Sequence, residues 1–315
     1  MKLKQLIAQY VAFRKDLGVS FENDASLLAS FSRTMGEEAD ISEVQADRVK
    51  AFLDGCRPIT CYWHRKHSAL TGFYRYAVSR GYVAAAPLPM IIPKQPERFV
   101  PYIYSYEELR RLLDGTTSYQ KQRMEMEPYT FRTILLTLYG AALREGECLS
   151  LTLSDVDLRQ SLLTIRDTKF YKSRLVPLGC DLNEAMLRYA RRRKAVGHSQ
   201  EGNAPFFVTK LGERIQNDLL RRAFRRLRKQ AGISRDDGAR YQPRLHDLRH
   251  SAAVHRLTIW YREGRDVQKL LPLLSTYMGH ADISGTQRYL TMTPELLQQA
   301  SSRFAAYAFA EVIHG

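Results

Sequence analysis

The sequence contains few acidic residues and no long apolar run. Asp and Glu number 33 against 48 Lys and Arg, which gives a formal net charge of +15. An excess of positive charge this large predicts a polyanionic partner, of which nucleic acid is the commonest, although charge alone leaves DNA, RNA and acidic membranes open. No apolar run is long enough to cross a bilayer, so we expect no membrane association through a spanning helix.

Cysteine is also scarce, and its spacing excludes a disulfide framework. The chain has 4 cysteines, at Cys56, Cys61, Cys148 and Cys180. Residues 1–18 alternate charged and apolar side chains with a helical period, which is unlike a secretory signal. These two observations predict a reducing cytoplasm as the location.

The length of 315 residues and the pattern of apolar residues predict two domains. Residues 1–92 have helical periodicity throughout, and a third helix in this part is expected to begin with Ser42 as its N-cap. Residues 93–104 form a linker in a stretch rich in proline, which lacks the amide donor. Residues 105–315 mix helices with two short β patterns at 161–167 and 173–178. The predicted fold class is mainly α with a small antiparallel β-sheet in the second domain.

The helix predicted over residues 60–80 has no Asp or Glu. It carries four basic residues, with aromatic side chains between them. An acid-free basic helix can lie in a groove of DNA and contact phosphates, and we expect Arg65 and Lys66 to do so. The alternative is that the aromatic residues are core and the basic residues a solvated face.

Two thiols and two imidazoles gather near this helix, which is the ligand count of a structural zinc site. They are Cys56, Cys61, His64 and His67. The spacing lacks the usual close Cys pair and His pair, so we predict no metal site.

Residues 183–194 and 217–231 form the richest basic stretches of the chain. One interpretation is that these basic residues only form a solvated surface. The density of arginine with so few acids favours contacts to backbone phosphates, for which Arg222 and Arg225 are candidates.

The segment from His246 to Tyr289 carries the strongest chemical pattern. Residues three and four apart share a helix face, so His246, Arg249 and His250 can point the same way. A cation flanked by imidazoles suits a phosphate, and Tyr289 beside a bound phosphate is a potential nucleophile. Elsewhere, Arg144 with Glu147 would ordinarily be an exposed helical ion pair, and a lysine at a hairpin tip would ordinarily serve solubility.

Taken together, these residues resemble the tyrosine recombinases, also called the phage integrase family, over nearly the whole chain. Six positions follow the family's active-site pattern in order, in the motifs ALREGECLSL, TKFYKSRLVPL, HDLRH, MGHADIS and TQRYL. They are Arg144, Lys169, His246, Arg249, His280 and Tyr289. Lys172 is the alternative to Lys169. The resemblance also implies an all-α, SAM-like core-binding domain at the N-terminus and a mixed catalytic domain after the linker.

The resemblance implies a site-specific recombinase that cleaves and rejoins DNA through a 3′-phosphotyrosine intermediate, without metal, ATP or other cofactor. Arg144, Arg249 and His280 would stabilise the transition state, and Lys169 would protonate the leaving 5′ oxygen. His246 would assist proton removal from Tyr289 or hold a phosphate oxygen. Supporting roles fall to Glu147, which orients Arg144, and to His250.

The expected partner is double-stranded DNA at a specific recombination site, bound by a homotetramer on two synapsed sites and by a monomer off DNA. A mobile element is the favoured context over chromosome-dimer resolution. The segment after Tyr289 could dock on its own domain or on a neighbouring subunit. The alternative functions are a type IB topoisomerase and a catalytically silent DNA-binding protein. A metal-dependent nuclease would need converging carboxylates, and we find no convincing acidic constellation in the sequence.

Overall fold

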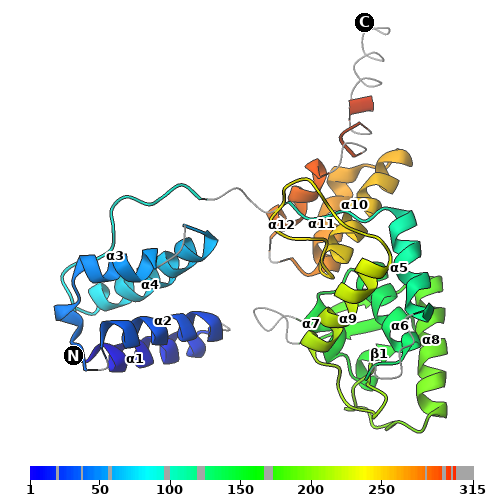
Figure 1. Ribbon diagram of the computed structural model, residues 1–315, viewed down its shortest axis with the longest axis horizontal. Coiled ribbons are helices and arrows are strands. Elements are labelled where there is room, and N and C mark those ends of the chain that lie inside the picture. The colour runs from blue at the N-terminus through cyan, green and yellow to red at the C-terminus, as the bar shows by residue number, and fades with distance from the viewer. Residues whose placement is uncertain are drawn as a thin grey trace, which may run out of the picture. The chain divides into compact units, whose positions relative to one another are not determined.

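The structure is a computed structural model, and it divides into two compact units. It describes residues 1–18, 21–36, 38–55, 59–95, 100–118, 125–166, 173–280, 282–292, 296–298 and 301–302. Unit 1 comprises the described residues up to 95, and unit 2 those from 100 onward. Figure 1 shows unit 1 in blue and cyan and unit 2 in green to red. No helix among the described residues is long and apolar enough to span a membrane.

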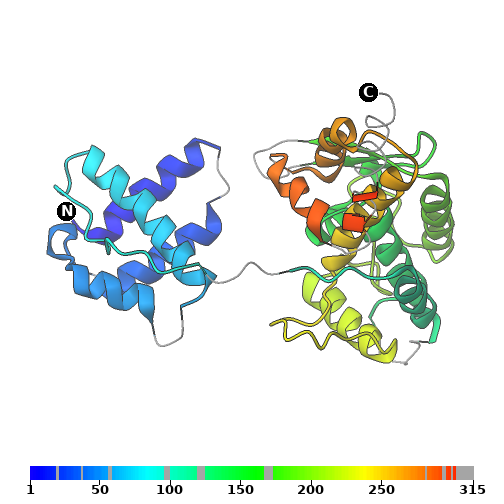
Figure 2. The same cartoon turned by 90° about the horizontal axis from the view of Figure 1, so that it is seen from above.

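Unit 1 is built from α-helices, as its sequence period predicts. The helix α4 packs against each of the other three, and Figures 1 and 2 show these helices side by side. Phe31, Phe73 and Tyr74 are fully buried at the centre of this core. The helices are α1 (Leu3–Asp16), α2 (Glu22–Met35), α3 (Ala46–Asp54) and α4 (Cys61–Ser79).

The expected cap of the third helix was wrong. Ser42 lies inside a 3-10 turn, Ile41–Glu43, in which the carboxylate of Asp40 accepts a hydrogen bond from the backbone N–H of Ser42. Val44 and Gln45 are extended, so α3 begins only at Ala46. Asp40 competes successfully for the cap because its other carboxylate oxygen, Oδ2, pairs with the N-terminal ammonium at 2.5 Å. Beyond α4, residues 83–95 and 100–105 contain no helix or strand, in line with their prolines.

Unit 2 combines the helices α5 to α12 with one small sheet. The sheet has the order β1-β2-β3, is antiparallel throughout and pairs Leu163 with Val176. The fold class predicted from the sequence is therefore confirmed. The strands are β1 (Val156–Asp157), β2 (Leu162–Ile165) and β3 (Arg174–Pro177). The helices are α5 (Tyr106–Ser118), α6 (Pro128–Gly140), α7 (Glu145–Ser150), α8 (Cys180–Ala195), α9 (Asn217–Gln230), α10 (Asp247–Arg262), α11 (Val267–Met278) and α12 (Ser284–Gln287).

The apolar helix α6 forms the centre of unit 2. It packs against α5, α8 and α10, and Phe131, Ile134 and Leu138 bury its side chains there. Its sequence is apolar on nearly all sides, which is typical of a helix surrounded by others. α6 holds α10 in place, while α11 and α12 pack together beside α10 (Figure 1). These four helices position the candidate site.

Candidate active site

The first turn of α10 carries three of the candidate residues. His246 is the N-cap of the helix, and Arg249 and His250 follow within one turn. The carboxylate of Asp247, which is fully buried, accepts hydrogen bonds from the backbone and the guanidinium of Arg244 at 2.8 and 2.9 Å. This anchoring fixes where the helix begins, and therefore where the three side chains point.

Arg249 is almost completely buried, with 2% of its surface exposed. Its guanidinium donates to the carbonyl of Ala142 at 2.5 Å and to the carbonyl of Met278 at 2.6 Å. Ala142 has a positive φ of 49°, an uncommon conformation for a residue with a side chain, just after α6 ends. Burial and the nearby charge of Arg144 lower the pKa of Arg249 to about 10, so it remains a cation at neutral pH.

Arg144 is the N-cap residue of α7, and its guanidinium lies at the end of α11, where that of Arg249 also binds. Its Nη1 donates to Oε1 of Glu147 at 2.6 Å, and its backbone N–H donates to Oε2 at 3.0 Å. Its Nη2 donates to the carbonyl of Gly279 at 2.7 Å. The side chain of Arg144 remains 36% exposed, so of the two candidate arginines it is the one open to solvent.

Glu147 has a second cationic partner, Arg174, which sequence reasoning missed. Arg174 donates to both carboxylate oxygens at 3.0 and 2.8 Å. Burial opposes ionisation of Glu147, but hydrogen bonds from Arg174 and from the backbone of Arg144 outweigh it and hold its pKa at about 2. The ion pair between Arg144 and Glu147 is thus not the isolated exposed pair that its spacing alone would suggest, because Glu147 is largely buried and also pairs with the largely buried Arg174.

Three consecutive carbonyls at the end of α11 bind three guanidinium groups. These carbonyls form the negative end of the helix dipole, where cations are favoured. Each arginine comes from a different element, namely β3, α10 and the N-cap of α7. The pairs are Tyr277 with Arg174, Met278 with Arg249, and Gly279 with Arg144.

Tyr289 lies in the 3-10 turn Arg288–Thr291 that follows α12, and it packs on α10. Its hydroxyl is 2.9 Å from Nδ1 of His250, and only 1% of the residue is exposed. Burial raises the pKa of Tyr289, while the charges of Arg249, Arg288 and Arg144 oppose that rise. The phenol is therefore protonated at neutral pH, and its nearest described proton acceptor is an imidazole.

All three imidazoles of the site are neutral at pH 7. Burial, followed by the charge of His246, lowers the pKa of His250 to about 2. Burial and the charge of Arg249 lower the pKa of His246 and of His280 to about 4. The ring of His280 lies 6.1 Å from that of Tyr289, and its Nδ1 is 2.6 Å from the hydroxyl of Thr286.

The candidate lysines, Lys169 and Lys172, lie outside the described residues. The structure describes the two sides of their hairpin, where β2 ends at Ile165 and β3 begins at Arg174. Because Arg174 donates through Nε to the carbonyl of Tyr277 at 3.1 Å, the start of β3 is attached to α11 beside Gly279.

The candidates for nucleic-acid contact in unit 1 have different surroundings. Arg65 is half-exposed on α4 and lies 3.4 Å from Asp24. The ammonium of Lys66 instead donates to the carbonyls of Phe52 and Leu53 at the end of α3, at 2.5 and 3.3 Å. Burial lowers the pKa of Lys66. Lys66 therefore caps a neighbouring helix, whereas Arg65 presents its charge outward.

The candidates on α9 lie on the exposed face of that helix, opposite its buried residues Leu220, Phe224 and Leu227. Arg222 contacts its own helix at the carbonyl of Asp218. A hollow of about 520 Å³ extends from α9 to the start of α10, and both Arg225 and His246 line it. The structure thus places this part of the arginine-rich helix next to the candidate site.

The thiols and imidazoles considered for zinc do not form a described cluster. Cys56 lies outside the described residues, and Cys61 is exposed. His67 stacks on the ring of Trp63 at 5.3 Å, and His64 contacts the same ring. Among the described residues, no three His, Cys, Asp or Glu side chains are placed to hold a metal ion.

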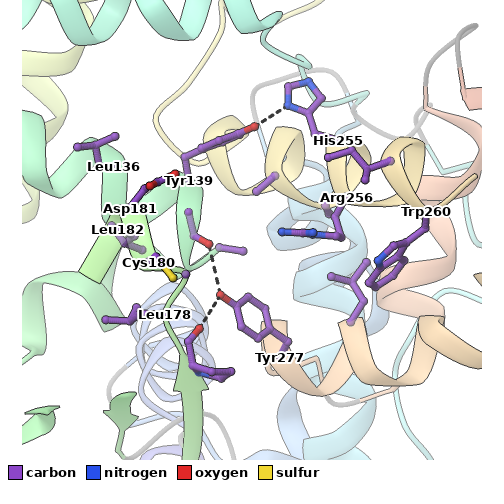
Figure 3. A pocket seen from close by; sticks show the side chains of 18 of the residues that line it. Leu136, Tyr139, Leu178, Cys180, Asp181, Leu182, His255, Arg256, Trp260 and Tyr277 are labelled. Carbon is purple, nitrogen blue, oxygen red and sulfur yellow. Dashed lines mark hydrogen bonds between the residues drawn. The ribbon is translucent and has the colours of Figure 1, made fainter. Parts of the chain in front are cut away.

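Unit 2 also contains a cavity that lies apart from the candidate catalytic residues. It measures about 670 Å³ and lies between α6, α8, α10 and α11 (Figure 3). Most of its lining is apolar, with Leu178, Leu182 and Trp260 in view. Figure 3 also shows the hydroxyl of Tyr277, which donates to the carbonyls of Gly140 and Pro177. None of the candidate residues lines this cavity.

The arrangement suits an oxyanion. Two guanidinium groups, from Arg144 and Arg249, can each donate two parallel N–H groups to a tetrahedral anion. Neutral imidazoles from His246 and His280 can add single hydrogen bonds. The phenol of Tyr289 contacts His250 and His280, and His250 packs against His246. The chemistry available is nucleophilic attack by a phenol on a phosphodiester held by protein cations.

Comparison with known proteins gives consistent matches. The model of the Phage integrase family matches residues 105–295. The "Putative integrase/recombinase y4rB" of Sinorhizobium fredii is 32% identical over 303 residues, which cover 95% of this chain and 96% of that protein. Tyrosine recombinase XerC of Chlorobaculum tepidum is 30% identical over 93% of this chain and 87% of its own.

Solved structures share the fold. The Tn1549 transposon integrase in complex with a circular intermediate DNA superposes with a TM-score of 0.70 at 17% identity, covering 96% of this chain and 99% of the other. A lambda integrase tetramer bound to a Holliday junction superposes with a TM-score of 0.67 at 15% identity, covering 92% of this chain and 77% of the other.

Proposed function

The chain belongs to the phage integrase family and is a site-specific DNA recombinase of the tyrosine class, and from this premise we propose how its own residues cleave and rejoin a strand. The oxygen of Tyr289 attacks the scissile phosphorus, so that a 3′-phosphotyrosine bond forms and the bond to the 5′ oxygen breaks. The 5′ oxygen leaves with a proton as a hydroxyl. The 5′ hydroxyl of another strand then attacks the phosphotyrosine and restores the phenol. The ester conserves the energy of the broken bond, so the exchange needs no ATP.

Arg144 and Arg249 bind the two non-bridging oxygens. In the described contacts, each guanidinium uses two of its five N–H groups on protein oxygens, so others are available for a phosphate. Because both groups are already held by the protein, little reorganisation is needed as charge develops on the pentacoordinate phosphorus. His280 and His246 each donate one further hydrogen bond.

His250, and not His246, receives the proton of Tyr289 in this proposal. Nδ1 of His250 is 2.9 Å from the phenol oxygen, which is a hydrogen-bonding distance. The pKa of His250, held near 2 by burial and positive neighbours, rises when a phosphate brings negative charge into the site. Proton transfer is thereby coupled to DNA binding. Lys169, or Lys172 beside it, remains the proposed acid for the 5′ oxygen.

The proposal rests on one observation, which is that candidate residues far apart in the sequence meet at one place in unit 2. Arg144 and Gly279, which lie 135 positions apart in the chain, meet at the end of α11, next to the start of α10. Tyr289 contacts His250, the residue that follows Arg249 in α10. A topoisomerase or a silent DNA-binding protein is not favoured, because the relatives carry the names of integrases and recombinases.

For the rest of the chain, we propose residues 1–92 as the core-binding domain, 93–104 as the linker and 105–315 as the catalytic domain. Double-stranded DNA would contact Arg65 on α4 and Arg222 and Arg225 on α9, whereas the capping role of Lys66 makes it a weaker candidate. A homotetramer on two synapsed sites is the proposed assembly, supported by the similar fold of the lambda integrase that forms a tetramer on a Holliday junction. The free thiols of Cys61, Cys148 and Cys180 suit a cytoplasmic location.

The test is covalent trapping. A library of palindromic duplexes is first selected for binding, and the selected site is then prepared as a suicide substrate with a nick next to the scissile phosphate. The protein is expected to form a covalent complex that persists in EDTA. Tyr289→Phe should bind the same DNA and form none. Covalent complex from the phenylalanine variant would refute Tyr289 as the nucleophile, and binding without trapping by the wild type would refute the reaction.

A further inference from the structure

Arg174 opens β3 as a charged residue on the inner face of the strand. Alternation along β3 puts it on the same side as Val176, which is fully buried, while Leu175 is 61% exposed. The side chain of Arg174 is only 10% exposed, as is that of its partner Glu147. An arginine enclosed in this way acts within the protein and not on a DNA surface.

The contacts of Arg174 all lead to the phosphate-binding cluster. It forms a two-pronged ion pair with Glu147 at 3.0 and 2.8 Å and reaches the carbonyl of Tyr277 at 3.1 Å. It also packs closely on Gly279, where a built Cβ would lie 2.5 to 2.9 Å from three guanidinium atoms. Oε1 of Glu147 is therefore shared between Arg174 and Arg144.

This sharing determines how Arg144 is held. A carboxylate and a guanidinium prefer a two-pronged pair, which uses one whole edge of the guanidinium. Because Arg174 occupies both oxygens of Glu147, Arg144 makes only a single side-chain bond to Oε1 and turns its Nη2 to Gly279. Without Arg174, Glu147 could rotate and draw Arg144 into a two-pronged pair of its own.

We propose that Arg174 is a positioning residue for strand cleavage, which acts by fixing Glu147 so that Arg144 remains oriented toward the phosphate. This inference rests on the proposed function. It assigns no contact between Arg174 and DNA, and it predicts a loss in the rate of the chemical step with little loss in DNA affinity.

The first experiment compares single-turnover cleavage of the suicide substrate with equilibrium binding of the same DNA. Arg174→Ala should cleave about 100-fold more slowly, because a small misplacement of a catalytic group has an effect of that order. Its DNA affinity should stay within about twofold. The matched control is Arg111→Ala, which removes a half-exposed arginine within 4.0 Å of Glu108 on α5 and should cleave at the wild-type rate.

A pH profile separates positioning from general loosening. The charged groups facing Glu147 are Arg144 on α7, Arg174 on β3 and Arg249 on α10, with the buried thiol of Cys148 as a neutral neighbour. When Arg174 is removed, burial raises the pKa of Glu147. Glu147 then becomes protonated as the pH is lowered and no longer holds Arg144 as an anion, so cleavage by Arg174→Ala should fall further. The double variant E147Q/R174A has no carboxylate to titrate and should lack that additional fall. Equal profiles for wild type and Arg174→Ala would overturn the proposal.

A modified leaving group distinguishes the two ways in which Arg174 could affect catalysis. In a substrate with sulfur in place of the bridging 5′ oxygen, the thiolate leaves without needing a proton. If Arg174 acts through Arg144, the defect of Arg174→Ala persists on this substrate. Restoration to the wild-type rate would mean that Arg174 acts through the hairpin acid, and the proposal would be wrong.

Arg174→Lys keeps the inference testable if the alanine variant does not fold. A lysine retains the charge but cannot form the two-pronged pair, so cleavage should fall by about 10-fold with unchanged binding. A wild-type rate for Arg174→Lys would refute the positioning role. If the wild type itself gives no covalent complex, the proposed function fails. If the wild type traps DNA and the Arg174 variants do so equally fast, only the positioning role fails.

Discussion

Mild acid should destabilise unit 2 strongly, because three of its imidazoles are buried beside cations. The pKa values of His246 and His280 lie near 4 and that of His250 near 2, all below the ordinary value of 6.5. The unfolded chain therefore takes up protons below pH 6.5 while the folded protein does not. The contribution of these groups to stability is complete above pH 6.5 and is lost as the pH falls below it.

The size of the effect follows from these values. Between pH 7.5 and 5.5, each histidine with a folded pKa of 4 or less should lower the free energy of unfolding by about 1.3 kcal/mol, which gives about 4 kcal/mol for the three. That is a large share of the stability of an ordinary domain. The single variant His250→Gln should reduce the pH-dependent loss by about a third.

Urea denaturation followed by tryptophan fluorescence can measure this in the full chain. The sequence has two tryptophans, Trp63 in unit 1 and Trp260 in unit 2, so a Trp63→Phe background reports unit 2 alone. Between pH 7.5 and 8.5 the histidines are neutral in both states, and the free energy should hardly change. A loss below about 1 kcal/mol between pH 7.5 and 5.5 would mean that these imidazoles are not held neutral in the folded protein.

Three further predictions concern the cluster and the basic helix. Glu147→Gln should bind DNA normally but cleave about 100-fold more slowly, as measured on the suicide substrate, because the anion that orients the arginines is lost. Gly279→Ala should lower the urea midpoint more than Gly264→Ala. Both glycines have a positive φ, costing about 1 kcal/mol or more, but only at Gly279 would the added Cβ meet a guanidinium. Equal midpoints would contradict the close packing. Arg222→Ala and Arg225→Ala should each reduce the slope of log affinity against log salt by about one, and an unchanged slope would remove that residue from the phosphate contacts.

The helices were predictable because their apolar residues repeat with the helical period. The helices α1 to α4 lie within residues 1–92, where the helical period predicted them, and β2 and β3 lie within the two β patterns at 161–167 and 173–178. The start of α3 was not predictable, because Ser42 and Asp40 are both good caps and the choice depends on an ammonium 39 residues away. The two-residue strand β1 has too short a pattern to be recognised.

The sequence supplied candidate residues for the site, which stay a prediction, but it did not supply the contacts between them. The order of the motifs along the sequence identified His250 and Tyr289 as candidates. Their contact, however, depends on how the turn after α12 packs on α10. Arg174 was hidden among the basic residues of the hairpin motif. One signal was available: it shares strand parity with Val176, so a period of two places a charge on the core face and predicts a buried partner.

The end of α11 also determines which changes this protein can tolerate. Because successive carbonyls along one helix end set the spacing of Arg174, Arg249 and Arg144, that spacing depends on chain length and backbone path and not on the side chains of Tyr277 or Met278. Exchanges of side chain in this last turn can leave the three arginines in register. Inserting or deleting one residue there would rotate the carbonyls by about 100° about the helix axis and displace all three arginines at once.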